Sequence, residues 1–308
     1  MIPVKVTRYA SLYFLVQGLG VLVWWYLLLT NDSVLKLFQM GSDGATLMSF
    51  QLPDMAFLGG GSLLAALLCY LRSQYMAYVA WFVAGLVTYA TFYAFNFALL
   101  TDTGWLGVVF MVPATIWSGV YAIGVSSLGH TMFRPSATSD AGRVLLKTFS
   151  QIVVVWTMIL GVMPYLITLV EPKIGLPQLE IPFQTPISVL LFVLASVPGV
   201  WSAIEMSKKG GGTPLPLDHA TKFVVSGPYA YVRNPMAVSG ILQGLVVALF
   251  WGSALVAIYA LMGSAVWQTI FRPHEEVDLA ARFGEEFNRY IKAVRCWVPS
   301  LKPYVDEG

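Results

Sequence analysis

The long apolar runs of this chain constrain its fold more than any other feature. A helix that crosses a bilayer needs about 20 mostly apolar residues. The residues are 57% hydrophobic and 11% charged, whereas about 25% of a soluble domain is charged. The pattern therefore predicts an all-α, polytopic membrane helical bundle with about eight transmembrane helices. The expected spans are 9–30, 55–71, 76–100, 104–128, 148–170, 186–204, 236–250 and 253–271.

The loop charges predict an orientation for these spans. If the N-terminus lies inside, the inner segments hold 16 of the 18 Lys and Arg residues, and the outer segments hold only Lys36 and Lys173. Lys and Arg favour the cytoplasmic side of a membrane. We therefore expect a multi-pass integral membrane protein with both termini in the cytoplasm. The inner segments are 1–8, 72–75, 129–147, 205–235 and 272–308.

The chain is expected to consist of two parts. Residues 1–147 form an N-terminal four-span transmembrane region, and residues 148–308 form a C-terminal core. The first four spans contain almost no ionisable residues, which argues against a proton-coupled transporter. Gly59-Gly60-Gly61 lacks the strand and the Lys of a phosphate loop, so it indicates close helix packing instead.

Cysteine and histidine give no sign of a metal centre. The chain has two cysteines, Cys69 and Cys296, and its histidines, His130, His219 and His274, are far apart in sequence. A disulfide framework would need more cysteines, and no metal-ligand spacing is present. We expect no metal.

The most unusual inner stretch is GPYAYVRNPM at residues 227–236. Asn234 is a good N-cap, and Pro235 suits the first position of the following helix. Arg233 has two interpretations: it is an interfacial anchor with its head group in water, or it is part of a binding site.

The C-terminal tail predicts an amphipathic cytoplasmic helix that starts near Pro273. Its apolar residues follow a three-four spacing and predict one stripe, made of Val277, Ala280, Gly284, Phe287, Ile291 and Val294. Glu275 and Glu276 would fall in its first turn, where acids complement the helix dipole. They are therefore either a cap or, like Arg233, part of a site.

A hairpin connects these two polar stretches. If residues 236–271 go out and back, with a tight turn at Trp251-Gly252-Ser253, Arg233 comes close to Glu275 and Glu276 at the membrane surface. An arginine binds a carboxylate and a glutamate accepts an ammonium group. The arrangement predicts a cytoplasmic pocket for a ligand with an amino-acid end, next to apolar helices.

The C-terminal part resembles the isoprenylcysteine carboxyl methyltransferase and phospholipid methyltransferase superfamily of integral membrane enzymes. The resemblance covers about residues 185–300, with weaker support from residue 148. It rests on G-P-Y-x-Y-x-R-N-P-M at 227–236, on E-E-x-x-L-x-x-x-F-G-x-E-F-x-x-Y at 275–290 and on V-x-x-W-V-P at 294–299. Two positions are characteristic of this chain: Met236 stands where an aromatic residue is frequent, and Asn234 stands where many members have His.

The resemblance implies methyl transfer from S-adenosylmethionine. Arg233 and Glu276 are the residues expected to act in catalysis, and the C-terminal helix is expected to cover the pocket. The residues expected to bind the cofactor are Gly227, Pro228, Tyr229, Tyr231, Val232, Arg233, Asn234, Pro235, Glu275 and Glu276.

The acceptor is expected to be lipophilic because the pocket opens at the membrane. A prenylated cysteine carboxylate, a phospholipid amine and a small apolar thiol or amine all remain open. Membrane lipids are expected partners and nucleic acid is not; a homodimer through the first four spans stays open. No general base is assigned, and Tyr229, Tyr231 and His219 are expected to pack or to line the cofactor.

Two other functions remain as alternatives. A membrane reductase of the sterol-reductase type shares a similar core and uses a nicotinamide cofactor, for whose phosphates this chain offers only Lys208, Lys209, Lys222 and Arg233. A non-catalytic membrane scaffold or transporter with this fold would bind neither cofactor.

Overall fold

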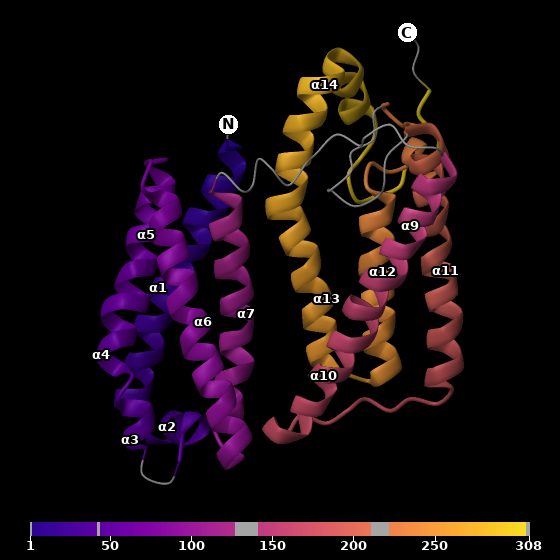
Figure 1. Cartoon of the computed structure of the whole chain (residues 1–308). Coiled ribbons are helices and arrows are strands. Elements are labelled where there is room, and N and C mark those ends of the chain that lie inside the picture. The colour runs from indigo at the N-terminus through magenta and orange to yellow at the C-terminus, as the bar shows by residue number, and fades with distance from the viewer. Residues whose placement is uncertain (1, 42–43, 127–140, 211–221, 306–308) are drawn as a thin grey trace. The chain divides into compact units, whose positions relative to one another are not determined.

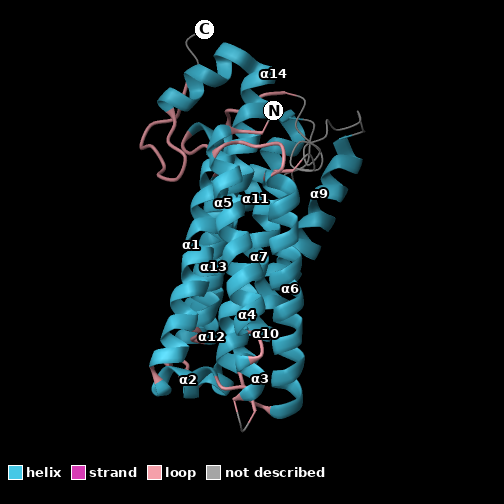
Figure 2. Ribbon diagram, turned by 90° about the vertical axis from the view of Figure 1, so that its left-hand side faces the viewer, coloured by secondary structure: helices cyan, strands magenta, loops and turns pink. Residues whose placement is uncertain are grey.

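The computed structural model describes residues 2–41, 44–126, 141–210 and 222–305, with the backbone alone for 141–148. Helices make up all of the regular structure within these ranges, and no strand occurs there (Figure 2). The expected all-α class is confirmed. His130, His219 and most of the Gly- and Pro-rich loop after Lys209 lie outside the described residues.

The helices follow one another along the chain as Figure 1 shows. The first part contains α1 (Val4–Thr30), α2 (Asp32–Phe38), α3 (Ala45–Met48), α4 (Gln51–Pro53), the π-helical η1 (Asp54–Gly59), α5 (Gly60–Tyr70), α6 (Met76–Thr101) and α7 (Trp105–Gly124). The second part contains α9 (Ala141–Trp156), η2 (Thr157–Val162), α10 (Met163–Val170), η3 (Glu171–Ile174), α11 (Gln184–Glu205), η4 (Met206–Gly210), η5 (Gly227–Ala230), α12 (Pro235–Trp251), α13 (Ala254–Val266), η6 (Trp267–Phe271) and α14 (Arg272–Ala293).

The number of membrane spans agrees with the expectation. Within the described residues, seven helices are long and apolar enough to cross a membrane, and α12 is a shorter apolar helix of 17 residues. The second span is longer than predicted, because α3, α4, η1 and α5 join into one helix over Ala45–Tyr70. The protein is therefore an integral multi-pass membrane protein.

The chain forms two compact units. One consists of Met1–His130 with Thr269–His274, and the other of Thr131–Gln268 with Glu275–Gly308. The bounds of these units do not test the predicted division at residue 147, which stays a prediction.

Small residues let the helices of the first unit approach closely. A side chain at Gly18 of α1 would lie 2.8 Å from Leu63 Cγ and 3.0 Å from the Gly59 carbonyl oxygen. A side chain at Gly61 would lie 3.2 Å from Val83 of α6. The Gly59-Gly60-Gly61 stretch therefore packs helices together, as its sequence context predicts.

A polar network crosses the interior of the same unit. Tyr13 donates to the Ala114 carbonyl at 2.9 Å, Gln17 donates to Ser62 at 3.1 Å, and Ser118 donates to Gln17 at 3.0 Å. Interhelical hydrogen bonds of this kind hold helices together where lipid offers no partners. The network thus ties α1 to α5 and α7.

In the second unit α12 and α13 form the expected hairpin. Gly252 has φ 62°, a left-handed conformation that favours glycine, and a side chain there would collide with the Leu179 carbonyl. Ser253 caps α13 by accepting from the Val256 N–H. The Ser253 hydroxyl and the Leu255 N–H both donate to the buried carboxylate of Glu171, at 2.7 and 3.1 Å. These bonds fix the turn, so α12 and α13 run back along each other.

Helix α14 begins at Arg272, next to the predicted start near Pro273, but it follows α13 and η6 directly and is not a separate helix. One helical stretch extends from Ala254 to Ala293, over 40 residues, with a break in its geometry at Gly284. Its apolar, membrane-spanning part ends near Phe271, and α14 continues beyond it. Glu275 and Glu276 therefore lie inside a continuous helix, where their neighbours' amides are already bonded, and the helix-cap interpretation of these two residues falls away.

The packing of Gly18 leads to a testable prediction. Gly18→Val should lower the thermal unfolding midpoint of the detergent-purified protein, because overpacking a tight helix contact costs about 1–3 kcal/mol. The matched control is Gly20→Val on the same helix, where a side chain would meet nothing within 4 Å. Equal midpoints for the two variants would contradict the close contact between α1 and α5.

Candidate functional site

The candidate site is built around the turn that precedes α12. Gly227 begins it with φ 61°, and Pro228 occupies the first turn of η5. The N–H groups of Tyr231 and Val232 both donate to the Pro228 carbonyl at 3.1 Å. Pro228, Tyr229 and Val232 are buried, whereas Tyr231 is 37% exposed. The apolar members of the motif therefore serve as its internal packing.

The C-terminal segment holds this turn from one side. The Arg233 N–H donates to the Arg295 carbonyl at 3.0 Å. The N–H groups of Ser300 and Tyr304 donate to the carbonyls of Tyr231 and Ala230, both at 2.8 Å. Three backbone hydrogen bonds thus bind residues 230–233 to residues 295–304.

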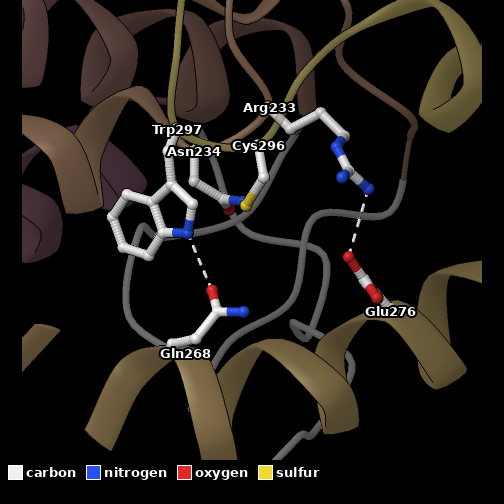
Figure 3. Close-up of polar contacts among 6 residues, drawn as sticks. All are labelled: Arg233, Asn234, Gln268, Glu276, Cys296 and Trp297. Carbon is white, nitrogen blue, oxygen red and sulfur yellow. Dashed lines mark hydrogen bonds and ion pairs between the residues drawn. The ribbon is translucent and has the colours of Figure 1, made fainter. Parts of the chain in front are cut away.

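Asn234 and Pro235 lie where the sequence predicts them, at the N-cap and the first position of α12. The Asn234 side chain makes no cap hydrogen bond; its amide donates instead to Cys296 Sγ at 3.2 Å (Figure 3). The asparagine therefore joins the start of α12 to the C-terminal segment.

A tryptophan that the sequence analysis did not assign to the site anchors the same segment. The indole N–H of Trp297 donates to the side-chain oxygen of Gln268 at 2.7 Å (Figure 3). Its ring also meets Trp267 edge to face, with centroids 5.2 Å apart. Both contacts connect it to η6 at the end of the last span. Trp297 belongs to the V-x-x-W-V-P motif, and this motif is the sequence feature that could have assigned Trp297 to the site.

The hairpin brings Arg233 and Glu276 together. Arg233 Nη1 lies 3.1 Å from Glu276 Oε1, and the two side chains are 14% and 22% exposed (Figure 3). Arg233 Nε is buried and has no hydrogen-bond partner among the described residues. A buried charged donor without a partner is costly. The guanidinium therefore offers an unused donor in a shielded place.

Glu275 lies near a different set of groups. Burial, and after it the negative charges of Glu276 and Asp278, raise the pKa of its carboxyl from 4.5 to about 7. The negative charge of Glu275 in turn raises the pKa of Tyr229 and of Tyr290, so these three side chains lie close together. The carboxyl is half protonated near neutral pH.

The tyrosines of the site stay protonated. Burial raises the pKa of Tyr229 and of Tyr290 well above the ordinary value of a phenol. The Tyr290 hydroxyl donates to the Tyr229 carbonyl at 2.7 Å. Neither phenol can accept a proton near neutral pH, and both serve to hold the turn against α14.

The second half of α14 packs onto the site through aromatic residues. Phe223 meets Phe283, Phe287 and Tyr290, with ring centroids 5.2 to 5.9 Å apart. The single predicted stripe is partly wrong: Val277 is 50% exposed, and Gly284, at φ 50° and ψ −122°, breaks the helical geometry. Before the break Val277 is exposed, and after it Phe287 and Val294 are buried.

A cleft of about 650 Å³ lies beside the turn, but Arg233, Glu275 and Glu276 do not line it. Its wall combines two cations with apolar side chains. The lining residues are Ala230, Arg289, Ala293, Val294, Ser300, Lys302, Pro303, Tyr304 and Val305.

Residues 183–286 match the family model described as phospholipid methyltransferase. This segment contains α11, the turn, the α12–α13 hairpin and both glutamates, so the resemblance seen in the sequence is confirmed there. The segment is a domain of this family of integral membrane methyltransferases. No curated protein and no solved structure matches the chain.

The ionisation of Glu275 leads to a prediction about stability. Since its pKa is raised in the folded protein, stability falls as the pH rises from about 4.5 through about 7. Glu275→Gln should remove this loss of stability, because a neutral amide need not be ionised in a buried place. The ligand-free variant should be more stable than the wild type by about 1–3 kcal/mol at pH 8, since one unit of pKa shift corresponds to about 1.4 kcal/mol. Thermal unfolding midpoints from pH 5 to pH 8 measure the difference.

The exposed Glu285 provides the control for this comparison. Glu285→Gln should reproduce the wild-type dependence on pH. A Glu275→Gln profile parallel to that of the wild type would mean that Glu275 is ionised in the folded protein throughout this range.

Proposed function

We propose that this chain, whose residues 183–286 form a phospholipid methyltransferase family domain, transfers a methyl group from S-adenosylmethionine to a lipophilic acceptor. The observation that carries the proposal is the guanidinium of Arg233. It is paired with Glu276 through Nη1, while its buried Nε lacks a partner. A ligand that carries both a carboxylate and an ammonium group satisfies this arrangement.

The site residues suit the amino-acid end of the cofactor. Arg233 Nε would donate to the ligand carboxylate in a charge-assisted hydrogen bond. Glu276, and Glu275 once it is ionised, would accept from the ligand ammonium group. A zwitterion adds one charge of each sign, so its binding leaves the net charge of the partly buried site unchanged.

The reaction needs little chemistry from the protein. When bound, S-adenosylmethionine supplies a methyl group on a positively charged sulfur. The contribution of this chain is to orient the reactants and to exclude water, since charge is dispersed rather than created. The protonated Tyr229 and Tyr290 do not serve as bases. A thiolate or carboxylate acceptor needs none, whereas an amine acceptor must lose its proton to another group.

The place of the site supports a lipophilic acceptor. The turn and α14 lie at the ends of apolar helices, and the loop charges favour the cytoplasmic side for this end. A prenylated cysteine carboxylate, a phospholipid amine and a small apolar thiol or amine all fit. The family match favours methyl transfer over the nicotinamide-dependent alternative and over a scaffold or transporter.

The first test of this proposal is calorimetric titration with S-adenosylmethionine and with its demethylated product, S-adenosylhomocysteine. Wild-type protein should bind both. Arg233→Ala and Glu276→Ala should each lose at least about 100-fold in affinity, because each removes one side chain of the partly buried ion pair that is proposed to hold the ligand.

The matched control for these variants is Glu285→Ala, which removes an exposed carboxylate from the same helix. It should bind like the wild type. Wild-type affinity in both Arg233→Ala and Glu276→Ala would overturn the proposal that these two residues bind the ligand. If folded wild-type protein bound neither compound, the nicotinamide cofactors would be titrated next.

Proton release distinguishes the roles of the two glutamates. If the ligand ammonium group approaches Glu275, it lowers the pKa of that carboxyl from about 7, so binding near pH 6.5 releases a proton and the affinity rises with pH. Titrations in two buffers of different ionisation enthalpy measure the release, and Glu275→Gln should abolish it. Binding without proton release would leave Glu276 as the acceptor of the ammonium group.

A further inference from the structure

The turn at residues 227–233, which we call the cofactor turn, is also held at its beginning, by contacts with the end of α11 and with η4. Helix α11 ends at Glu205, η4 continues to Gly210, and the described chain resumes at Lys222. The Lys222 N–H donates to the Gly210 carbonyl at 3.2 Å. The Ser226 hydroxyl donates to Glu205 Oε2 at 2.7 Å. The chain segments that flank residues 211–221 are thus joined to each other at two points.

Lys209 completes a three-residue contact at the second of these points. Its Nζ lies 2.7 Å from Glu205 Oε2 and donates to Ser226 Oγ at 2.9 Å. We call Glu205, Lys209 and Ser226 the Glu205 clasp. Each member contacts the other two, so the carboxylate of Glu205 fixes Ser226, the residue directly before the cofactor turn.

Gly227 is seated against the clasp. A side chain on Gly227 would lie 2.8 Å from Glu205 Cγ and 3.2 Å from Trp201 Nε1. Its φ of 61° is also a conformation that side chains disfavour. The backbone of the turn therefore touches the side chain of Glu205, and its place depends on where that side chain lies.

We infer that Glu205 is a positioning residue for the cofactor site, which it serves through Ser226 and Gly227 without touching the ligand. The inference rests on the proposed function. Backbone bonds from residues 295, 300 and 304 hold the turn at 230–233, and the clasp holds its beginning at 226–227. Loss of the clasp leaves the turn held at one end only, so Arg233 is less well placed toward Glu276.

The clasp can be removed without unfolding the protein. The Lys209 side chain is 57% exposed, so water screens the ammonium group, and its ion pair with the 18% exposed Glu205 contributes little to global stability. Its effect is therefore local. This separates a positioning role from a general structural one, since a general one would lower the unfolding midpoint.

The first experiment measures hydrogen exchange of the backbone amides of residues 222–233 in ligand-free protein. Glu205→Gln, Ser226→Ala and Lys209→Met should each raise the exchange rate at least about tenfold there and leave the transmembrane helices and the unfolding midpoint unchanged. The matched control is Lys208→Met, which removes the same charge from the exposed neighbour of Lys209. Unchanged exchange in both Glu205→Gln and Ser226→Ala would overturn the clasp.

The second experiment measures affinity for S-adenosylhomocysteine. Glu205→Gln and Ser226→Ala should each weaken binding about tenfold. The double variant should bind no more weakly than the poorer single variant, because both substitutions break the same contact between Glu205 and Ser226. Wild-type affinity in both single variants would overturn the positioning role. If wild-type protein did not bind the compound while the exchange results held, the proposed function would fail and the clasp would stand.

A charge swap tests whether Glu205 acts through position or through its own charge. The double variant Glu205→Lys with Lys209→Glu keeps an ion pair and a group that can donate to Ser226. It should recover most of the affinity lost in Glu205→Lys alone. If Glu205 attracted the ammonium group of the ligand directly, the swap would bind as poorly as the single variant, and the positioning role would be overturned.

Discussion

A backbone inside a bilayer has no water to bond with, so its amides must pair within a helix. This constraint makes α12 and α13 rigid rods that can turn only at their ends, and the turn at Gly252 and Ser253 is fixed by the buried carboxylate of Glu171. A hairpin of this kind returns the chain to the face from which it left. The meeting of Arg233 with Glu276, 43 residues apart, follows from that geometry.

The polar site depends on segments with little regular structure. The turn at 227–233 contains only a short helical piece, and its carbonyl and amide groups bond to the C-terminal segment instead. Trp297 holds that segment at the end of the last span through Gln268. Backbone bonds are satisfied by partners from distant parts of the sequence, which makes the turn rigid without a helix of its own.

The three carboxylates of this region have different surroundings and therefore different roles. Glu276 faces a guanidinium, Glu205 faces an ammonium and a hydroxyl, and Glu275 faces phenols and other acids. Lys209 and Ser226 lower the pKa of the Glu205 carboxyl, whereas burial beside other negative charges raises that of Glu275. The adjacent Glu275 and Glu276 thus differ in chemistry because successive residues of a helix point in different directions.

The sequence by itself determined the helical class, the apolar spans, the hairpin turn and the pairing of Arg233 with the Glu-Glu stretch. These features depend on local composition and on the length of the spans, and both can be read along a chain. The tertiary structure decided that α13 continues into α14, that Gly284 breaks this helix, and that Asn234 bonds Cys296. It also decided that Glu205 and Trp297 hold the turn. Contacts of these kinds depend on which distant side chains come within about 3 Å of one another, and periodicity along the sequence carries no information about that.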